Sequence, residues 1–465
     1  MVYKIFRKVV LLIMLSITAG LLAKNLGLNP RQVLTISVFS MSILGTLLFW
    51  DFRLSFAFFG TSILLITRTL DLENLIRFSS LEIILFLIGM MVIIGMLKDA
   101  GFFAWVVSLI LRMRNFTAKK FVLAISITSM LLAGAVDETT SIIFIVAAVL
   151  EICDYFEVNP TPYIIISVFA TNIGSMSTVL GNPIGILIAT KSGLTFEDFI
   201  LKAFPLAIIC LIVAICISII WFRKSLKELD LKIKEVGDNE MLIRLISIPP
   251  EKETKIALLV FILTLFGLAF SHRLDLFWGL ETNTILLIIP LFVAGIIMIW
   301  KSQKARKFIE KDVEWWTLLF FLFLFAQAGA LKYTSTTDVL AKKLIGAVKN
   351  NASLLMSVIL WLGGFASSVL DNVVLVAAVV PIIQSFKGIY VALQPFWWAL
   401  LFGGCLGGNI TLVGSTANIV AIGILEKERH IKIHFFNWFW IGLIIGILTI
   451  AITWLAILII PFYRG

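Results

Sequence analysis

Charged residues, histidine and cysteine are all scarce in this sequence of 465 residues. Only 14% of the residues are charged and three are histidine, whereas a soluble globular domain carries about 25% charged residues. The four cysteines form no CxxC pair and have no histidine at metal-ligand spacing. These scarcities argue against a soluble enzyme, a disulfide scaffold or a cysteine-bound metal.

Apolar residues are correspondingly abundant in the composition. They make up 60% of the chain, and the mean hydropathy is +1.06. A helix needs about 20 mostly apolar residues to cross the hydrocarbon core of a bilayer, so the sequence predicts a polytopic membrane protein. The net charge of +10 then reflects Lys and Arg retained in cytoplasmic loops, and we expect the lipid bilayer, not nucleic acid, as partner.

The predicted fold class is an all-α polytopic membrane protein with about 11 transmembrane helices. We expect two inverted repeats, with two re-entrant hairpins and two broken helices. The predicted organisation is N-terminal scaffold helices (1–80), repeat 1 (81–222) with a hairpin at about 120–152 and a broken helix at 161–190, a cytoplasmic linker (223–255), scaffold helices (256–314), and repeat 2 (315–465) with a hairpin at about 352–385 and a broken helix at 395–425.

The repeat is predicted from matches at nearly one displacement along the chain. Asp371 corresponds to Asp137, and the stretch Gly329-Ala330-Leu331-Lys332 corresponds to Gly95-Met96-Leu97-Lys98, both at a displacement of 234. Thr411-Leu412-Val413-Gly414 corresponds to Thr178-Val179-Leu180-Gly181 at a displacement of 233. An odd number of predicted spans separates the two copies, which turns the second upside down. Inverted repeats of this kind occur in many secondary transporters, whose sites lie at the repeat interface.

Basic residues predict the orientation of the chain. Lys4, Arg7 and Lys8 at the start favour a cytoplasmic N-terminus in the cell membrane. Most other clusters of Lys and Arg then fall on the same side. The exceptions, predicted to lie outside, are Lys332, Lys342, Lys343 and Lys349.

Two pairs of polar residues interrupt strongly apolar sequence. Asp137 and Glu138 form the first pair, and Asp371 and Asn372 form the second. A carboxylate at membrane depth costs about 2.5 to 3.5 kcal/mol, so it usually faces the protein interior or a watery cavity. The alternative is a helix cap in which Asp accepts backbone N–H bonds, and a capping Asp can also line a site. Glu138 is the sharper candidate for a group that picks up and releases a proton.

The two predicted broken helices are rich in Gly, Asn and Thr. Residues 170–185 include Asn172, Thr178 and Asn182, and residues 403–418 include Asn409, Thr411 and Asn418. Glycine lets the backbone leave helical geometry, and the freed carbonyls, hydroxyls and amides are hard oxygen ligands. Close helix packing through small residues is the alternative, but it does not explain the asparagines. We expect Na⁺, if any metal ion, near Asn172, Thr178, Asn409 and Thr411.

No catalytic constellation emerges, so we do not expect an enzyme. His272, His430 and His434 fall in predicted loops, where we expect them to be solvated. Gln327 lies in a predicted span and is expected to make a helix–helix hydrogen bond. No cofactor is expected beyond a coupling Na⁺ or H⁺.

The segments Leu406–Asn418 and Ser368–Val373 resemble motifs of the ion transporter superfamily, which includes arsenite/antimonite permeases, the pigmentation P-protein group, NhaD-type Na⁺/H⁺ antiporters and citrate transporters, and is related to the dicarboxylate/sodium symporters. The resemblance covers about residues 80–460. It implies a scaffold domain, a transport domain with two opposed hairpins, a homodimer and elevator-type alternating access. It also implies hairpin tips at Asp137-Glu138-Thr139 and Asp371-Asn372-Val373. The residues expected at the substrate or ion site are therefore Asp137, Glu138, Thr139, Asn172, Thr178, Asn182, Asp371, Asn372, Asn409, Thr411 and Asn418.

The first half departs from the family pattern. The usual Gly-Asp-Pro-Pro-Asn reads Gly181-Asn182-Pro183-Ile184-Gly185, and Glu138 stands where Asn is usual. Both tips begin with Asp, which would repel a dicarboxylate. We therefore expect a secondary transporter of a small inorganic ion or an oxyacid such as arsenite or antimonite, coupled to H⁺ or Na⁺. A citrate, dicarboxylate or other organic-anion symporter and a Na⁺/H⁺ antiporter are the alternatives. Some arsenite permeases associate with a soluble ATPase, but no feature of this sequence favours such a partner.

Overall fold

The protein is built from α-helices in the computed structural model, which describes residues 2–111, 113, 116–236 and 251–463. No β-strand occurs within these ranges. Short π-helical turns occur at Phe199–Ala203 and Phe308–Asp312, and short 3₁₀ turns at Trp50–Phe52 and Pro461–Tyr463. The α-helices are α1 Val2–Asn25, α2 Pro30–Leu48, α3 Arg53–Ile66, α4 Leu72–Phe78, α5 Leu81–Asp99, α6 Phe102–Leu111, α7 Ala118–Ala135, α8 Glu138–Tyr155, α9 Thr161–Ser175, α10 Pro183–Ser192, α11 Phe196–Asp198, α12 Phe204–Trp221, α13 Arg223–Val236, α15 Lys252–Ala269, α16 Ser271–Trp278, α17 Thr284–Trp300, α18 Ser302–Lys307, α19 Trp315–Tyr333, α20 Thr336–Ala347, α21 Ala352–Ser367, α22 Asn372–Gln384, α23 Gln394–Gly407, α24 Thr416–Arg429 and α25 Phe435–Ile459.

Many of these helices are long and apolar enough to cross a membrane. Among the described residues seven helices meet that standard, or up to nine if each sharply bent helix pair counts as one span. The pair α20 and α21 bends by 114°, and the pair α15 and α16 bends by 55°. The predicted fold class, an all-helical, multi-pass membrane protein, is therefore confirmed. The number of eleven spans and the inverted repeats stay predictions.

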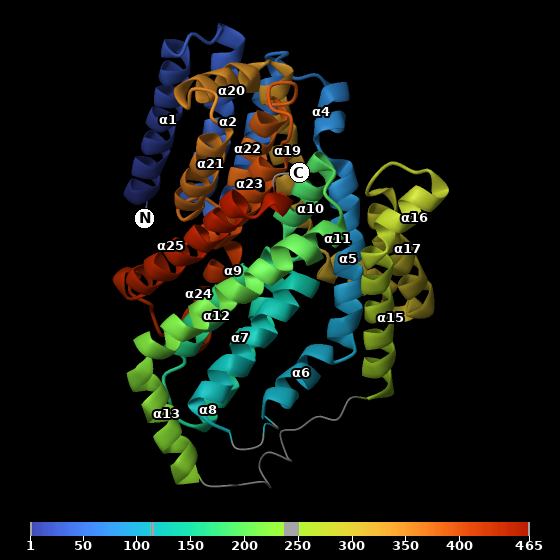
Figure 1. Ribbon diagram of the computed structural model, residues 1–465, viewed down its shortest axis with the longest axis vertical. Helices are drawn as coiled ribbons and strands as arrows, with labels where there is room; N and C mark the ends of the chain where they lie inside the picture. Colours follow the sequence, from blue (N-terminus) through green and yellow to red (C-terminus); the bar gives the residue numbers. More distant parts are fainter. Residues whose placement is uncertain (1, 112, 114–115, 237–250, 464–465) are drawn as a thin grey trace.

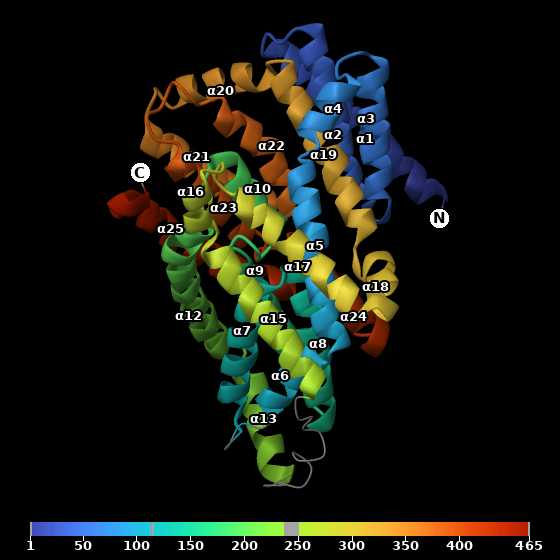
Figure 2. The same ribbon diagram turned by 90° about the vertical axis from the view of Figure 1, so that its right-hand side faces the viewer.

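Different helices lie at the two ends of the long axis of the molecule. Figures 1 and 2 show α4 and α20 at one end and α6 and α13 at the opposite end. Helix α5 runs between these ends and packs against α17, α10 and α19. The two ends of α5 therefore lie toward opposite ends of the molecule.

Two glycines allow the helices around the hairpins to pack closely. A Cβ on Gly174 of α9 would collide with the backbone of Met130 in α7, and a Cβ on Gly407 of α23 would collide with the backbone of Gly364 in α21. Both contacts are between backbones, so a side chain could not move out of the way. Glycine at these two positions therefore fixes each hairpin arm against the broken helix of its own half.

The predicted linker at 223–255 contains a helix. Helix α13 follows α12 directly, and its Asp230 Oδ1 accepts a hydrogen bond of 2.7 Å from the first backbone N–H of α7, on Ala118. The hydroxyl of Tyr163 in α9 donates to the carbonyl of Ser225 at 3.1 Å. Helix α13 is thus held by hydrogen bonds to α7 of the first hairpin and to α9 of the first broken helix. Residues 237–250 of the predicted linker lie outside the described residues.

The prediction for Gln327 is confirmed, whereas that for His272 is wrong. The Gln327 amide of α19 donates to the Ala57 carbonyl at 2.8 Å and to the Thr61 hydroxyl at 3.1 Å, joining α19 to α3. His272 lies in α16 rather than in a loop, and it is half-buried. The polar sequence around it forms a short amphipathic helix packed on α17 and α15. His430 and His434 are exposed, as expected.

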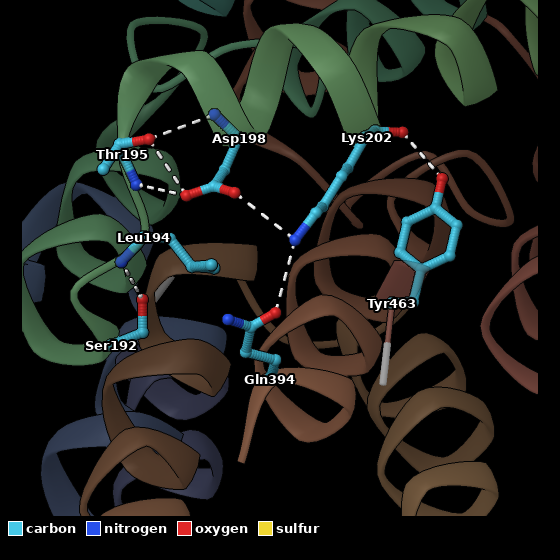
Figure 3. A network of polar contacts seen from close by, with 7 residues as sticks. All are labelled: Ser192, Leu194, Thr195, Asp198, Lys202, Gln394 and Tyr463. Atoms are coloured by element: carbon cyan, nitrogen blue, oxygen red, sulfur yellow. Dashed lines mark hydrogen bonds and ion pairs between the residues drawn. The ribbon is translucent and has the colours of Figure 1, made fainter. Parts of the chain in front are cut away.

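A polar network fixes the start of α12 against α23 and the C-terminal turn (Figure 3). Lys202 is buried, and its ammonium lies 3.3 Å from Asp198 Oδ1 and 3.3 Å from the side-chain oxygen of Gln394. Asp198 also accepts bonds from Thr195 as part of a capping box. The hydroxyl of Tyr463 donates to the Lys202 carbonyl at 2.8 Å. The network therefore joins residues far apart in the sequence.

Candidate functional site

The two helical hairpins α7–α8 and α21–α22 bring the predicted acidic tips together. Glu138 is the first residue of α8, and Asn372 is the first residue of α22. The Asn372 side-chain amide donates to Glu138 Oε1 at 3.3 Å, and both residues are buried. Glu138 Oε2 is buried with no hydrogen-bond partner among the described residues. One carboxylate oxygen is thus anchored, and the other remains free to bind a cation or a proton.

The two aspartates act as helix caps, which was the alternative reading of the sequence. Asp137 Oδ1 accepts bonds from the backbone N–H groups of Thr139 at 2.7 Å and Thr140 at 3.0 Å. Asp371 caps α22 in the same way and also accepts a bond of 3.0 Å from the Thr416 hydroxyl. Each Asp therefore orients the helix that carries its neighbour, Glu138 or Asn372. Thr139 lies in the same turn and is half-buried.

Three predicted asparagines meet between the broken helices. The Asn172 amide of α9 donates to Asn409 Oδ1 at 3.0 Å and to Asn418 Oδ1 at 2.9 Å. The Asn418 amide in turn donates to the carbonyls of Gly408 at 2.7 Å and Thr411 at 2.8 Å. All three side chains are buried. The cluster links the two halves of the sequence at the point where α9 and α23 end.

Asn182 contacts α9 and α23 through two residues that were not among the expected site residues. Its amide contacts the Ser175 hydroxyl at 3.1 Å and Cys405 Sγ at 3.2 Å, and its oxygen caps α10 by accepting from Gly185 N–H at 3.0 Å. Ser175 and Cys405 are both buried. Both lie within the two polar breaks, at residues 170–185 and 403–418, but only the packing of α9 against α23 brings them to Asn182.

Thr178 and Thr411 use their hydroxyls to attach the breaks to the hairpins. Thr178 donates to the carbonyl of Gly134 in α7, and Thr411 donates to the carbonyl of Ser368 next to α21. Neither hydroxyl contacts the asparagine cluster directly, although the Thr411 carbonyl does. Their role as ion ligands stays a prediction, and their contacts indicate that they hold each hairpin tip in place.

A cavity of about 260 Å³ opens beside the hairpin tips. Asp137, Glu138 and Thr139 line one side, and residues of α5 and the segment before α19 line the other. We name this the tip cavity. Its charged lining residues are Lys98, Asp137, Glu138, Lys311, Asp312 and Glu314. Four acids and two bases make it acidic overall, and the Lys98 ammonium lies 3.6 Å from Asp312. Asp312 and Glu314 were not expected at the site, because they flank a predicted span and belong to no motif.

The chemistry available at the tips and the asparagine cluster is that of hard oxygen ligands. Glu138 Oε2 and Asn172 Oδ1 are both buried and unpaired among the described residues. Carboxylate and amide oxygens suit small hard cations. In the described ranges no group of three or more His, Cys, Asp or Glu has metal-ligand spacing.

The apolar helices, the broken helices that meet in polar sequence and the cavity beside them define a multi-pass membrane transporter. The chain belongs to the citrate transporter family, CitMHS, whose profile matches residues 53–403. It is 28% identical over 353 residues to an uncharacterized transporter of Mycobacterium tuberculosis, covering 75% of this chain and 79% of that protein.

Two further comparisons extend this result. The human P protein is 26% identical over 433 residues, covering 77% of this chain but only 51% of the P protein. The YdaH transporter of Alcanivorax borkumensis superposes with a TM-score of 0.57 at 12% identity, covering 83% of this chain and 86% of that one. At this identity the structural likeness concerns the fold alone.

Proposed function

We propose that this protein is a secondary active transporter of a small inorganic ion or oxyacid, such as arsenite or antimonite, coupled to H⁺ or Na⁺. The observation that carries the proposal is the buried contact between Glu138 and Asn372, which leaves Glu138 Oε2 unpaired. A carboxylate in an apolar interior is stable only when it is protonated or paired with a cation. Loading and release of the coupling ion at Glu138 would therefore change the charge of the hairpin tips.

The charge around the site favours a cation or a neutral species over a free organic anion. Asp137, Asp371 and Glu138 surround the tips, and no Lys or Arg makes a hydrogen bond or ion pair to any of them in the described ranges. An anion entering next to three carboxyl groups would meet like charge. A neutral oxyacid or a cation would not meet this barrier.

Alternating access by an elevator movement is part of this proposal. The hairpins and broken helices of the two halves contact one another through α9 and α23, α10 and α23, and α10 and α22. Together they form one body that carries Glu138 and the asparagine cluster. Helices α5 and α19 line the other side of the tip cavity and would form part of the stationary wall. A homodimer in the cell membrane with a cytoplasmic N-terminus completes the proposed arrangement.

Flux measurements in proteoliposomes test the role of Glu138. With Glu138→Gln we expect uptake driven by a pH or Na⁺ gradient to fall to background, while exchange at equal ion concentrations on both sides persists. Glu151→Gln is the matched control, because Glu151 lies on the same helix, α8, and is exposed. Gradient-driven flux that survives in Glu138→Gln as it does in Glu151→Gln would show that Glu138 is not the coupling residue.

A citrate or dicarboxylate symporter is the second candidate, favoured by the family name and by Lys98 and Lys311 in the tip cavity. Uptake of labelled citrate, arsenite and antimonite under the same gradients separates the two.

A Na⁺/H⁺ antiporter is the third candidate. Adding Na⁺ alone, with no other substrate, would then change the pH inside the liposomes, which an enclosed pH-sensitive dye reports.

A further inference from the structure

A second cavity lies near the opposite end of α5, away from the tip cavity. It has a volume of about 250 Å³ and is lined by residues of α4, α10, α19 and α22. We name it the basic cavity, because its charged lining residues are Arg77, Lys191 and Lys332. Ser80, just before α5, lines the basic cavity, and Lys98, near the end of α5, lines the tip cavity. At 1.5 Å per residue these positions are about 27 Å apart along the helix.

Residues of the two cavities correspond in sequence. Lys332 of the basic cavity corresponds to Lys98 of the tip cavity, and Gly329 corresponds to Gly95, both at the displacement that separates the aspartates of the two hairpins. In the other direction, Lys311 of the tip cavity corresponds to Arg77 of the basic cavity at the same displacement. Each cavity thus contains one lysine near the end of a span and one base in the segment before the other span.

The packing contacts around these residues correspond as well. A Cβ on Gly95 would meet the side chain of Asp312, and a Cβ on Gly329 would meet the side chain of Phe78. Asp312 and Phe78 are themselves related by the displacement of the repeat. The Lys98–Asp312 ion pair therefore has an equivalent position in the basic cavity, where Phe78 occupies the place of the acid.

Glu314 of the tip cavity also has no acidic counterpart in the basic cavity. Glu314 corresponds to Ser80 at the same displacement, and both line their respective cavities. The basic cavity therefore has counterparts of both bases, Lys98 and Lys311, but an acidic counterpart of neither Asp312 nor Glu314. Lys332 donates to the neutral side-chain oxygen of Gln384 at 3.1 Å instead of to a carboxylate. Arg77 makes no hydrogen bond or ion pair within the part of the chain that the structure describes.

Acids outside the cavity balance its charge only in part. Glu82 is paired with Lys191 at 2.9 Å, whereas neither Arg77 nor Lys332 forms an ion pair with a carboxylate in the described ranges. Bringing cations together without counter-charges costs electrostatic free energy, which a bound anion relieves. The buried Ser80 hydroxyl, which makes no capping bond to α5, lines the same cavity and adds a donor there.

We propose that the basic cavity binds an oxyanion, a phosphate or carboxylate group, between Arg77, Lys191 and Lys332. The lining of the cavity also contains apolar side chains, including Phe78, Leu187, Phe325 and Val380. Basic and apolar groups in one cavity can accept either the headgroup of an anionic lipid or a free oxyanion from solution. The site is separate from the hairpin tips, so it does not depend on which substrate the transporter carries.

Thermal unfolding of the purified full chain tests the proposal. In a neutral detergent, inorganic phosphate is titrated against sodium chloride of matched ionic strength. In nanodiscs, phosphatidylglycerol mixed with phosphatidylcholine is compared with phosphatidylcholine alone. Stabilisation by phosphate indicates a free oxyanion, and stabilisation by phosphatidylglycerol alone indicates a lipid headgroup. If neither ligand raises Tm above its neutral or chloride reference, the proposal is wrong.

Variants locate the effect in the basic cavity. In Lys332→Met we expect the half-saturating concentration of the stabilising ligand to rise about tenfold, the size expected for losing one charged hydrogen-bond partner. Lys342→Gln is the matched control, an exposed lysine on the neighbouring α20. Phe78→Asp restores the missing acid and should abolish the stabilisation while leaving the Lys332–Gln384 bond in place. If Lys332→Met does not fold, Phe78→Asp and Ser80→Glu test the proposal in its place, because each adds an acid to the cavity and should weaken the stabilisation by the ligand. An unchanged response in both of them would overturn the proposal.

Discussion

Glu138 and Asn372 occupy corresponding positions in the two halves of the sequence and touch one another across the two hairpin tips. The contact is asymmetric, because a carboxylate faces an amide. Two carboxylates at this distance would repel each other in an apolar interior, whereas two amides would leave no ionisable group in the pair. The pair therefore combines one ionisable group with one neutral donor.

Exchanging the two residues tests whether the pair acts as a unit. Asn372→Glu alone brings a second carboxylate within reach of Glu138, and we expect ion-coupled uptake to fall by about tenfold or more. The double variant Glu138→Asn with Asn372→Glu restores one acid and one amide and should recover part of the uptake. Initial rates in proteoliposomes measure both. If the double variant is no better than Asn372→Glu, the two residues act independently.

The asparagine cluster should contribute to stability even without substrate. In Asn172→Ala, Asn409 and Asn418 each lose a donor inside the protein, and an unsatisfied buried acceptor costs about 1–3 kcal/mol. We expect a clear fall in Tm in detergent. Asn437→Ala, at an exposed position in α25, serves as the control. Equal melting temperatures for the two variants would show that the cluster does not hold the broken helices together.

The close approach of α9 to α7 makes Gly174 sensitive to the smallest side chain. Gly174→Ala places a Cβ against the backbone of Met130, and overpacking of this kind costs about 1–3 kcal/mol. Gly423→Ala, in α24, is the matched control, because its Cβ would meet nothing within 4 Å. Melting curves of the two variants should differ. If Gly174→Ala is as stable as Gly423→Ala, α7 and α9 are free to move apart.

The network around Lys202 should matter for stability and not for substrate affinity. Lys202→Met removes a buried ammonium from Asp198 and Gln394 (Figure 3), and the loss of these contacts should cost about 1–3 kcal/mol. Lys255→Met, at an exposed position in α15, is the control. We expect a lower Tm for Lys202→Met with an unchanged KM for transport in folded protein. A raised KM with an unchanged Tm would place Lys202 in the transport pathway instead.

Much of the site could be predicted because polar residues are conspicuous in apolar sequence. Asp137, Glu138, Asp371 and Asn372 stood out for this reason. The same contrast marked Asn172, Asn409 and Asn418, which the structure brings into one cluster. Asp312 and Glu314 could not be recognised in the same way. They lie at the polar end of a span, where charge is ordinary, and only packing turns them toward the hairpin tip.

The sequence by itself determined the class of protein, because apolar runs of bilayer length exclude other folds and the polar breaks within them mark helix ends. It also contained the displacement that relates the two halves. Only the tertiary structure decided which of these residues meet. Contacts between Glu138 and Asn372, or between Gly329 and Phe78, join positions far apart along the chain. Such contacts depend on the angle and register of packed helices, which no local pattern encodes. Only the linings of the two cavities together show that the basic cavity has no acidic counterpart of Asp312 or Glu314.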